Sequence, residues 1–407
     1  MDSKKVNVMV FFILLYFLGG LNLLNPHPPI KSDVENRMLK NKPEFSWPAL
    51  ASGDYFKEME DFFADHFVGR EYFVQGSLAA RDLRGIPNQD RADLVFHQGA
   101  NAFVTQNSTE QEPPGDAGSM VGQILVMGDR AMELHKFNRG CSREYASVIN
   151  QFSSRVGPGV QVYSLLAPTQ IEYLNNRRYK TFSSPQRETI RYVNRCLSPS
   201  IKAVNAYQAL RQTAAHEYLY FRTDHHWTAR GAYYAYTAFM KTIHQVPVPL
   251  DQYQEEKVEN FLGSLYDISR SNQLQEHPDT VYYYPPLAPH QYTVYYDVAV
   301  EMPTIDLNFA ESESKYSIFL SGDRPLGKIT TEVQNGKKIL VVKDSYGNAL
   351  IPFLIPHYQE IYFVDPRLYK GNVVNLVQEN GIQEVLFLNY VLVTSSSDYS
   401  QLIQGLL

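Results

Sequence analysis

Residues 338–351 read KILVVKDSYGNALI, an apolar and β-branched run followed by a short polar turn and a second apolar stretch. The first run is typical of a buried strand, and the glycine and asparagine of the turn mark a break before a helix. A serine at such a turn is lifted out of the carboxyl edge of a sheet, where N–H groups at the helix start face a developing oxyanion. We therefore predict that Ser345 is a nucleophile.

A base for this nucleophile is predicted within residues 221–234, which read FRTDHHWTARGAYY. Asp224 and His226 are two positions apart, and residues with that spacing project to the same side of an extended segment. The carboxylate is then placed to orient the imidazole, as the acid and base of a catalytic triad require. Thr228 is predicted to be the N-cap of a helix that begins at Ala229.

Two alternatives stay open at these positions. Ser264 is a second candidate nucleophile because it follows Gly263, although no strand is predicted before it. An aspartate beside two histidines also fits a metal-ligand set, or a structural cluster with His225 and Trp227 in the core. The metal interpretation needs further ligands, and the other histidines form no second paired cluster, so we predict no metal.

The N-terminus is typical of a membrane anchor. Lys4 and Lys5 precede residues 6–24, VNVMVFFILLYFLGGLNLL, whose nineteen residues in a helix just span a hydrocarbon core of about 30 Å. The lysines predict a cytoplasmic tail over residues 1–5 and export of the remainder. A cleaved signal peptide is the alternative, although no A-x-A-like site follows. We predict a single-pass protein of the cell membrane with an extracytoplasmic catalytic domain.

The remainder of the chain divides into a linker with a helical extension, residues 25–92, and one large domain, residues 93–407. An amphipathic helix is predicted over 54–73 from its aromatic spacing and is expected to dock on the large domain. Strands and helices then alternate, which predicts an α/β sheet. The predicted helices lie at 132–156, 188–195 and 201–217, and the predicted strands at 94–104, 160–168, 360–365 and 385–389.

Composition limits the functional classes. A net charge of -6 and a pI near 6.0 give no general attraction to nucleic acid, and 407 residues with 44% hydrophobic content can bury a large core. No nucleotide-binding motif is present, and no cofactor is predicted. Cys141 and Cys196 can pair outside the cell, but their spacing does not establish a disulfide.

Four segments of the sequence resemble the DHHW protein family. They are DHHW at 224–227, NFLGSLY at 260–266, VKDSYGN at 342–348 and VDPR at 364–367. That family is similar to the SGNH-hydrolase-like O-acetyltransferases of bacterial exopolysaccharide modification, such as those acting on alginate. The serine turn reads KDS rather than GDS and follows the histidine block, and one residue separates acid and base rather than two. Both departures fit the acetyltransferase branch better than the free esterases.

The resemblance implies an SGNH-like three-layer sandwich with a mostly parallel sheet and a Ser-His-Asp triad. Ser345 corresponds to the nucleophile, His226 to the base and Asp224 to the orienting acid. The triad would move acetyl groups onto or off polysaccharide hydroxyls through an acetyl-serine intermediate. The N–H of Ser345, with that of Gly347 or the Asn348 side chain, is expected to hold the oxyanion.

Three further residues are candidates for oxyanion or substrate binding. Arg367 is expected at the end of a strand, where it would anchor a substrate carboxylate or hydroxyl or else form a surface salt bridge. His225 and Tyr346 are the other two. The resemblance implies a membrane-bound O-acyltransferase partner that supplies the acetyl group. The alternative from another class is a catalytically inactive carbohydrate-binding scaffold subunit of a polysaccharide-modification complex.

Overall fold

The protein is represented by a computed structural model that describes residues 31–32, 37–38, 42–43, 45–47, 50, 53–67, 92–96, 123–174 and 180–407. Contacts divide the chain into two units, residues 1–89 and 90–407, which are described separately. Among the described residues, no helix has both the length and the apolar character needed to cross a membrane. The tail predicted over 1–5 and the anchor predicted over 6–24 lie outside the described residues.

The first unit contains the helix α3 (Asp54–Asp65). It is the predicted amphipathic helix, but it ends eight positions before the predicted end at residue 73. Two short strands, β1 (Lys31–Ser32) and β2 (Arg37–Met38), pair antiparallel. The docking of this helix on the large domain stays a prediction.

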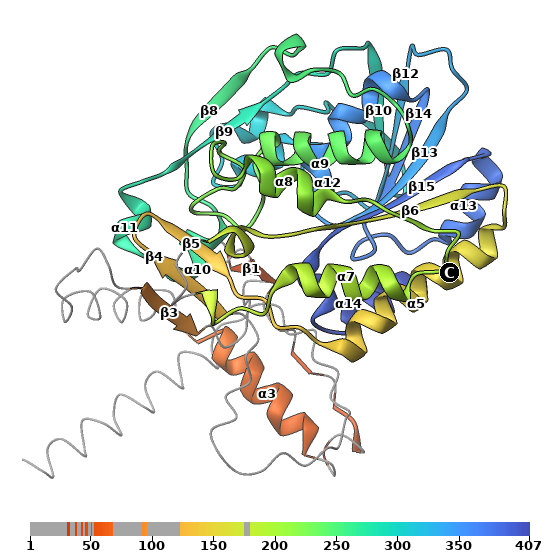
Figure 1. The fold of residues 1–407 in the computed structure, drawn as a ribbon. Coiled ribbons are helices and arrows are strands. Elements are labelled where there is room, and N and C mark those ends of the chain that lie inside the picture. Colours follow the sequence, from red (N-terminus) through yellow and green to blue (C-terminus); the bar gives the residue numbers. More distant parts are fainter. Residues whose placement is uncertain are drawn as a thin grey trace, which may run out of the picture. The chain divides into compact units, whose positions relative to one another are not determined.

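The second unit is built on an eight-stranded mixed sheet (Figure 1). Adjacent strands are parallel from β14 to β7 and antiparallel from β11 to β14. The predicted α/β class is confirmed, but a mostly parallel sheet is not, because a hairpin and one returning strand extend one edge. In spatial order the strands are β11 (Ala299–Glu301), β10 (His290–Tyr295), β12 (Leu326–Thr331), β14 (Glu360–Val364), β13 (Lys338–Lys343), β15 (Glu384–Tyr390), β6 (Gln161–Ala167) and β7 (Lys202–Ala203).

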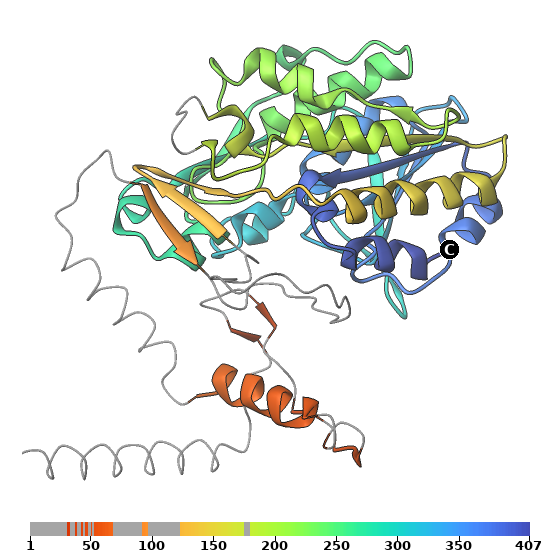
Figure 2. The same cartoon turned by 60° about the horizontal axis from the view of Figure 1, so that its bottom comes forward.

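Helices cover both faces of this sheet, and Figure 2 shows the layers from a second direction. One face carries α8 (Ala206–Thr213), α9 (Ala229–Thr242) and α12 (Tyr346–Leu350). The other carries α5 (Arg139–Val156), α7 (Gln186–Cys196), α13 (Val373–Asn380) and α14 (Asp398–Gly405).

Strand β13 is buried on both faces, which explains why its sequence is apolar at successive positions. Ile339 and Val341 pack in the core beneath α9, whereas Leu340 and Val342 pack in the core beneath α5. Side chains alternate between the two faces of a strand, so a strand covered by helices on both faces must be apolar throughout. Helix α12 follows at the carboxyl end of β13, where the site lies.

Two smaller antiparallel sheets complete the second unit. One consists of β3 (Ala92–Phe96), β4 (Gln123–Met127) and β5 (Arg130–Glu133), and the other of β8 (Glu256–Phe261) and β9 (Asp279–Tyr283). Two short helices, α10 (Ser264–Ser269) and α11 (Asn272–Gln275), connect β8 to β9. The 3₁₀ helices are Gln170–Tyr173, Leu250–Gln252, Leu307–Phe309, Lys315–Ile318, Ile351–His357 and Val391–Thr394.

Most predicted elements of the second unit are present. Strands β6, β14 and β15 and helix α7 match their predicted positions, and Thr228 caps α9 by accepting the N–H of Gly231. The helix predicted from 132 begins only at Arg139, because residues 130–133 pair with β4. The helix predicted from 201 begins at Ala206, because Lys202–Ala203 extends the sheet. Cys141 and Cys196 are both free thiols, so they form no disulfide with each other.

Candidate active site

Ser345 lies where β13 ends, immediately before α12, as the strand-turn-helix pattern predicts. The preceding Asp344 fixes the turn: its Oδ1 accepts the N–H of Tyr346 at 2.9 Å and its Oδ2 accepts the N–H of Tyr390 at 2.8 Å. These bonds join the turn to the end of β15. Burial raises the pKa of the Asp344 carboxyl to about 6. The position of Ser345, the predicted nucleophile, is therefore tied to two parallel strands.

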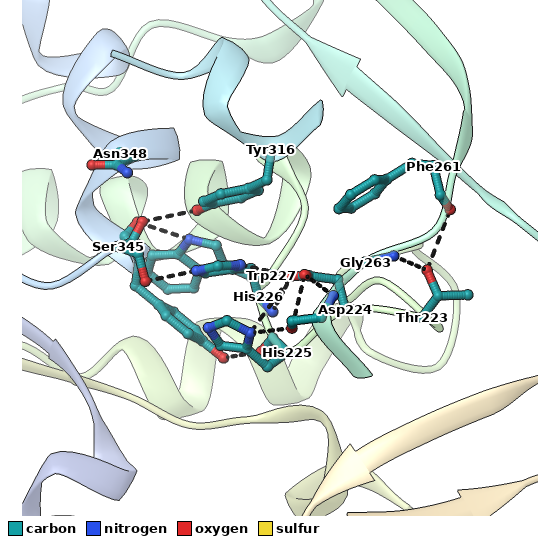
Figure 3. A network of polar contacts seen from close by, with 12 residues as sticks. Thr223, Asp224, His225, His226, Trp227, Phe261, Gly263, Tyr316, Ser345 and Asn348 are labelled. Carbon is teal, nitrogen blue, oxygen red and sulfur yellow. Dashed lines mark hydrogen bonds and ion pairs between the residues drawn. The ribbon is translucent and has the colours of Figure 1, made fainter. Parts of the chain in front are cut away.

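The residues predicted as nucleophile, base and acid form one hydrogen-bonded chain (Figure 3). His226 Nε2 lies 2.7 Å from Ser345 Oγ, and His226 Nδ1 lies 2.6 Å from Asp224 Oδ1. A carboxylate can only accept, so Nδ1 carries the proton and Nε2 presents a lone pair to the Ser345 hydroxyl. The arrangement can withdraw the hydroxyl proton of Ser345.

The sequence suggested that an extended segment brings Asp224 and His226 together, but the structure has a different backbone conformation there. Asp224 Oδ1 also accepts the backbone N–H of His226 at 2.9 Å, which makes a local turn of residues 224–226. The same oxygen thus holds the imidazole by its ring and by its own backbone. The two-residue spacing gave the correct pairing, but through a different backbone conformation.

The second oxygen of Asp224 is held by α10. Ser264 donates its N–H at 2.9 Å and its hydroxyl at 3.0 Å to Asp224 Oδ2. Gly263 permits this approach, because a Cβ built there would lie 2.2 Å from the Cβ of Asp224. A strand, β8, does precede Ser264, contrary to expectation. Nevertheless, its hydroxyl is bound to Asp224, and Ser264 is not hydrogen-bonded to His226 as Ser345 is.

Asp224 is ionised because its donors outweigh its burial. Burial by itself would raise the pKa of this carboxyl, but the neighbouring His226 and His225 and the N–H of Ser264 hold the pKa well below its ordinary range. Ser264 also lies 2.6 Å from His225 Nδ1. Since its hydroxyl proton is donated to Asp224, its oxygen accepts from His225, which places the proton of His225 on Nδ1.

Aromatic rings fix the plane of His226. Tyr316 stacks on it with ring centroids 3.8 Å apart and an interplanar angle of 5°, and the His225 centroid lies 3.7 Å from it. The Tyr316 hydroxyl donates to the carbonyl oxygen of Ser345 at 3.0 Å, so the ring that stacks on His226 is also bound to the turn that carries Ser345. Sequence reasoning missed Tyr316, because a single tyrosine far from both motifs carries no local signal.

The predicted oxyanion donors need one correction. The N–H of Gly347 donates to the carbonyl of Asp344 at 3.0 Å, so it is already used. Gly347 instead makes room for Lys343, whose Cβ would lie 2.7 Å from an added Cβ. Within residues 123–174 and 180–407, no group accepts the N–H of Ser345. Asn348 is three residues further along, on the same face of the helical turn. Its amide nitrogen donates one proton to Asp323 Oδ1 at 2.9 Å, which leaves its second proton as a candidate oxyanion donor.

The three candidate substrate-binding residues differ in their environments. Arg367 forms the salt-bridge alternative: its Nη2 lies 2.8 Å from Asp323 Oδ2 and 2.5 Å from Asp365 Oδ2. Its side chain is still 34% exposed, and its Nη1 has no partner in the described part of the chain. Tyr346 is fully buried and donates to the carbonyl of His225, so it is a packing residue.

His225 is partly exposed, with 26% of its side chain accessible. Burial and the adjacent His226 lower its pKa, so the ring is neutral near pH 7 with an unprotonated Nε2. Asp224, His225 and His226 offer ligand atoms within 4.8 Å of one another. However, His226 Nδ1 is hydrogen-bonded directly to the Asp224 carboxylate, and His225 Nδ1 is connected to that carboxylate through the Ser264 hydroxyl. These hydrogen bonds fit proton transfer better than metal ligation.

Comparison with known proteins identifies the family. The family model described as DHHW protein matches residues 96–364, more than half of the chain. The chain belongs to the DHHW family. A DHHW family protein from Eubacterium siraeum has a similar crystal structure, with 30% identity and a TM-score of 0.63 over 72% of this chain and 98% of that chain. No curated protein matches this DHHW protein.

Two more distant solved structures are also similar to this DHHW protein. Bacillus cereus PatB1 has 22% identity and a TM-score of 0.60 over 69% of this chain and 99% of its own, and it has also been solved with a sulfonyl adduct. The likeness to PatB1 concerns the fold. The O-acetyltransferase domain of Pseudomonas putida AlgJ has 14% identity and a TM-score of 0.37, over 70% of this chain and 100% of that domain. A TM-score this low carries no argument about function.

Proposed function

We propose that this DHHW protein transfers acetyl groups to or from hydroxyls of a cell-surface or secreted polysaccharide through an acetyl-Ser345 intermediate. The observation that carries this proposal is the hydrogen-bonded chain of Ser345, His226 and Asp224, with contacts of 2.7 and 2.6 Å. A serine hydroxyl beside an imidazole that a carboxylate orients is the arrangement that acyl transfer through serine requires.

The first half-reaction forms the acetyl-enzyme. Ser345 Oγ attacks the carbonyl carbon of an acetyl ester while His226 Nε2 takes the hydroxyl proton. Asp224 stabilises the imidazolium that forms. The tetrahedral intermediate then expels the alcohol of the donor, which receives the proton from His226, and the acetyl group remains as an ester on Ser345.

The second half-reaction repeats these steps with an acceptor. A sugar hydroxyl gives its proton to His226 and attacks the acetyl carbon, and Ser345 leaves and regains the proton. Water in place of the sugar gives acetate and makes the protein an esterase. The N–H of Ser345 and the Asn348 amide would hold the oxyanion in both halves, and each good donor lowers the barrier by roughly 3–4 kcal/mol.

The substrate class and location rest on the sequence. The resemblance to polysaccharide O-acetyltransferases supports a sugar hydroxyl as acceptor, and the apolar run at 6–24 supports a membrane-anchored, extracytoplasmic enzyme. A membrane-bound O-acyltransferase would then supply the acetyl group. For the acceptor we propose contacts from His225 Nε2 and Arg367 Nη1, the nitrogen atoms described above as unprotonated and unpartnered, respectively.

The proposal is tested by incubating the full chain with p-nitrophenyl acetate and locating acetyl groups by mass spectrometry. We expect acetyl on Ser345, dependent on His226, and its loss in Ser345→Ala with the fold retained. Ser264→Ala is the matched control and should still be acetylated. A folded wild-type protein that shows no acetyl-Ser345, yet binds polysaccharide equally well without Ser345 and His226, would favour the inactive scaffold instead.

A further inference from the structure

A buried cluster of charges lies beside the nucleophile turn. Lys343, the last residue of β13, is fully buried, and its Nζ lies 3.3 Å from Asp323 Oδ1 and 3.7 Å from Asp365 Oδ2. Arg367 contacts both aspartates. The two cations and two anions balance, yet the two aspartates have different further partners.

Asp323 alone of the two contacts the oxyanion candidate. Its Oδ1 accepts the side-chain amide N–H of Asn348 at 2.9 Å, and Asn348 is three residues after Ser345 on the same side of the turn (Figure 3). The Asn348 Oδ1 is buried and has no hydrogen-bond partner in the described part of the chain. An unpaired buried carbonyl is unfavourable, so a purely structural asparagine would be expected to turn its amide over.

The carboxylate of Asp323 prevents that rotation. Turning the amide would place Asn348 Oδ1 against Asp323 Oδ1, two acceptors at hydrogen-bond distance. The amide nitrogen of Asn348 carries two protons at a fixed angle, and one of them is hydrogen-bonded to Asp323. The direction of the second proton is therefore determined by Asp323.

The backbone that carries Asp323 is held in an unusual conformation. Leu320 and Ser321 have positive φ angles of 55° and 57°, followed by Gly322 at 87°. A leucine in this region is strained and persists only where surrounding contacts enforce it. Those contacts include two hydrogen bonds. The Leu320 N–H donates to the Thr304 carbonyl at 2.9 Å, and the Tyr292 hydroxyl donates to the Leu320 carbonyl at 3.1 Å.

We propose that Asp323 is a positioning residue that directs the second amide proton of Asn348 toward the oxyanion formed at Ser345. This inference rests on the proposed function, and Asp323 lies outside the four segments that resemble the DHHW family. Burial would raise the pKa of Asp323, but Lys343 and Arg367 outweigh it and hold the pKa low. Asp323 is therefore a full carboxylate acceptor throughout the physiological pH range.

The competing explanation is that Asp323 only balances the charges of Lys343 and Arg367. Asp365 provides the matched control, because it contacts the same two cations and is not hydrogen-bonded to Asn348. Asp323→Asn and Asp365→Asn remove the same charge from the same cluster. Only the first removes the carboxylate that fixes the amide.

The experiment measures the rate of acetyl-Ser345 formation from p-nitrophenyl acetate in the full-length variants. We expect Asp323→Asn to lower the maximal rate roughly 10- to 100-fold at unchanged KM, since a misdirected donor costs up to what a deleted one costs. Asp365→Asn should stay within about threefold of wild type. In Asn348→Ala the Asp323 substitution should add nothing further, because both act through one donor. Equal rates in the two aspartate variants, or additive losses with Asn348→Ala, would overturn the proposal.

Two further measurements separate positioning from charge and from folding. Asp323→Glu keeps the charge but displaces the carboxylate by one methylene, so acetyl-Ser345 formation should remain slow in this variant. A wild-type rate in Asp323→Glu would show that Asp323 acts through charge balance alone and would overturn the proposal. The side-chain amide protons of Asn348, observed by ¹⁵N NMR, should lose exchange protection in Asp323→Glu and keep it in Asp365→Asn. Unchanged protection refutes the positioning contact whether or not Ser345 is acetylated. A wild type that is never acetylated refutes instead the proposed function.

Discussion

Asp224→Asn is the substitution whose effect follows most directly from the geometry. Each oxygen of Asp224 accepts one backbone N–H, that of His226 at 2.9 Å and that of Ser264 at 2.9 Å. Asparagine has one acceptor oxygen and one NH₂ group. Whichever way its amide turns, the NH₂ group faces a backbone N–H that cannot move away. The substitution preserves the volume of the side chain but not its pattern of acceptors.

The magnitude follows from the two orientations. With NH₂ toward His226, Nδ1 must become an acceptor, the proton moves to Nε2, and Nε2 can no longer take the Ser345 proton. With NH₂ toward Ser264, the tautomer is correct but the imidazolium lacks its counter-charge. Loss of the orienting carboxylate in such a site slows acylation by up to about 10⁴-fold. We expect a loss of roughly 10³- to 10⁴-fold, equivalent to about 4–5.5 kcal/mol in the barrier.

The assay is the pre-steady-state release of p-nitrophenol, with acetyl-Ser345 measured in parallel by mass spectrometry. Asp267→Asn is the control, because Asp267 lies on the same helix α10 and pairs with Arg270 at 3.3 Å rather than with the histidines. It should react within a few-fold of wild type. An Asp224→Asn protein that is folded and acylates within tenfold of wild type would refute the assigned role of the carboxylate.

Three other substitutions test neighbouring parts of the site. Ser264→Ala removes the hydroxyl that donates to the charged Asp224 and accepts from His225, so the free energy of unfolding should fall by about 1.5–3 kcal/mol or more in urea denaturation while acetyl-Ser345 persists; loss of the adduct would contradict this. Gly347→Ala places a Cβ 2.7 Å from Lys343 Cβ and should destabilise by about 1–3 kcal/mol in calorimetry, whereas an unchanged Tm would disprove the contact. The raised pKa of Asp344 means that its contribution to stability is lost as pH rises from its ordinary 3.8 to about 6, a difference of about 3 kcal/mol. Asp344→Asn should remove that dependence, and parallel stability curves for the two proteins would show that Asp344 does not titrate there.

The sequence predicted the site because its main residues stand in local patterns. Ser345 follows an apolar run and precedes Gly347, and Asp224 and His226 are two positions apart beside a helix N-cap. Each pattern depends on contacts within a few residues, and such contacts are encoded locally. The same is true of β6, β14, β15 and α7, whose apolar periodicity spans a whole element.

The errors occurred where distant strands compete with local preference. The predicted helix was placed from Met132, but residues 130–133 form a strand that pairs with β4 because a partner strand is available. The returning strand β12 makes the sheet mixed, and no local pattern shows which neighbour a strand will choose.

The sequence by itself determined the family and the α/β class, and it predicted the three residues of the proposed triad. Only the tertiary structure decided what surrounds them: Tyr316 against His226, Ser264 on Asp224 and Asp323 on Asn348. The physical reason is separation along the chain, since His226 and Ser345 are 119 residues apart and Ser264 and Asp224 are 40. Contacts at that separation form only when the strands and helices pack, so the roles of these partners appear in the fold and not in any local motif.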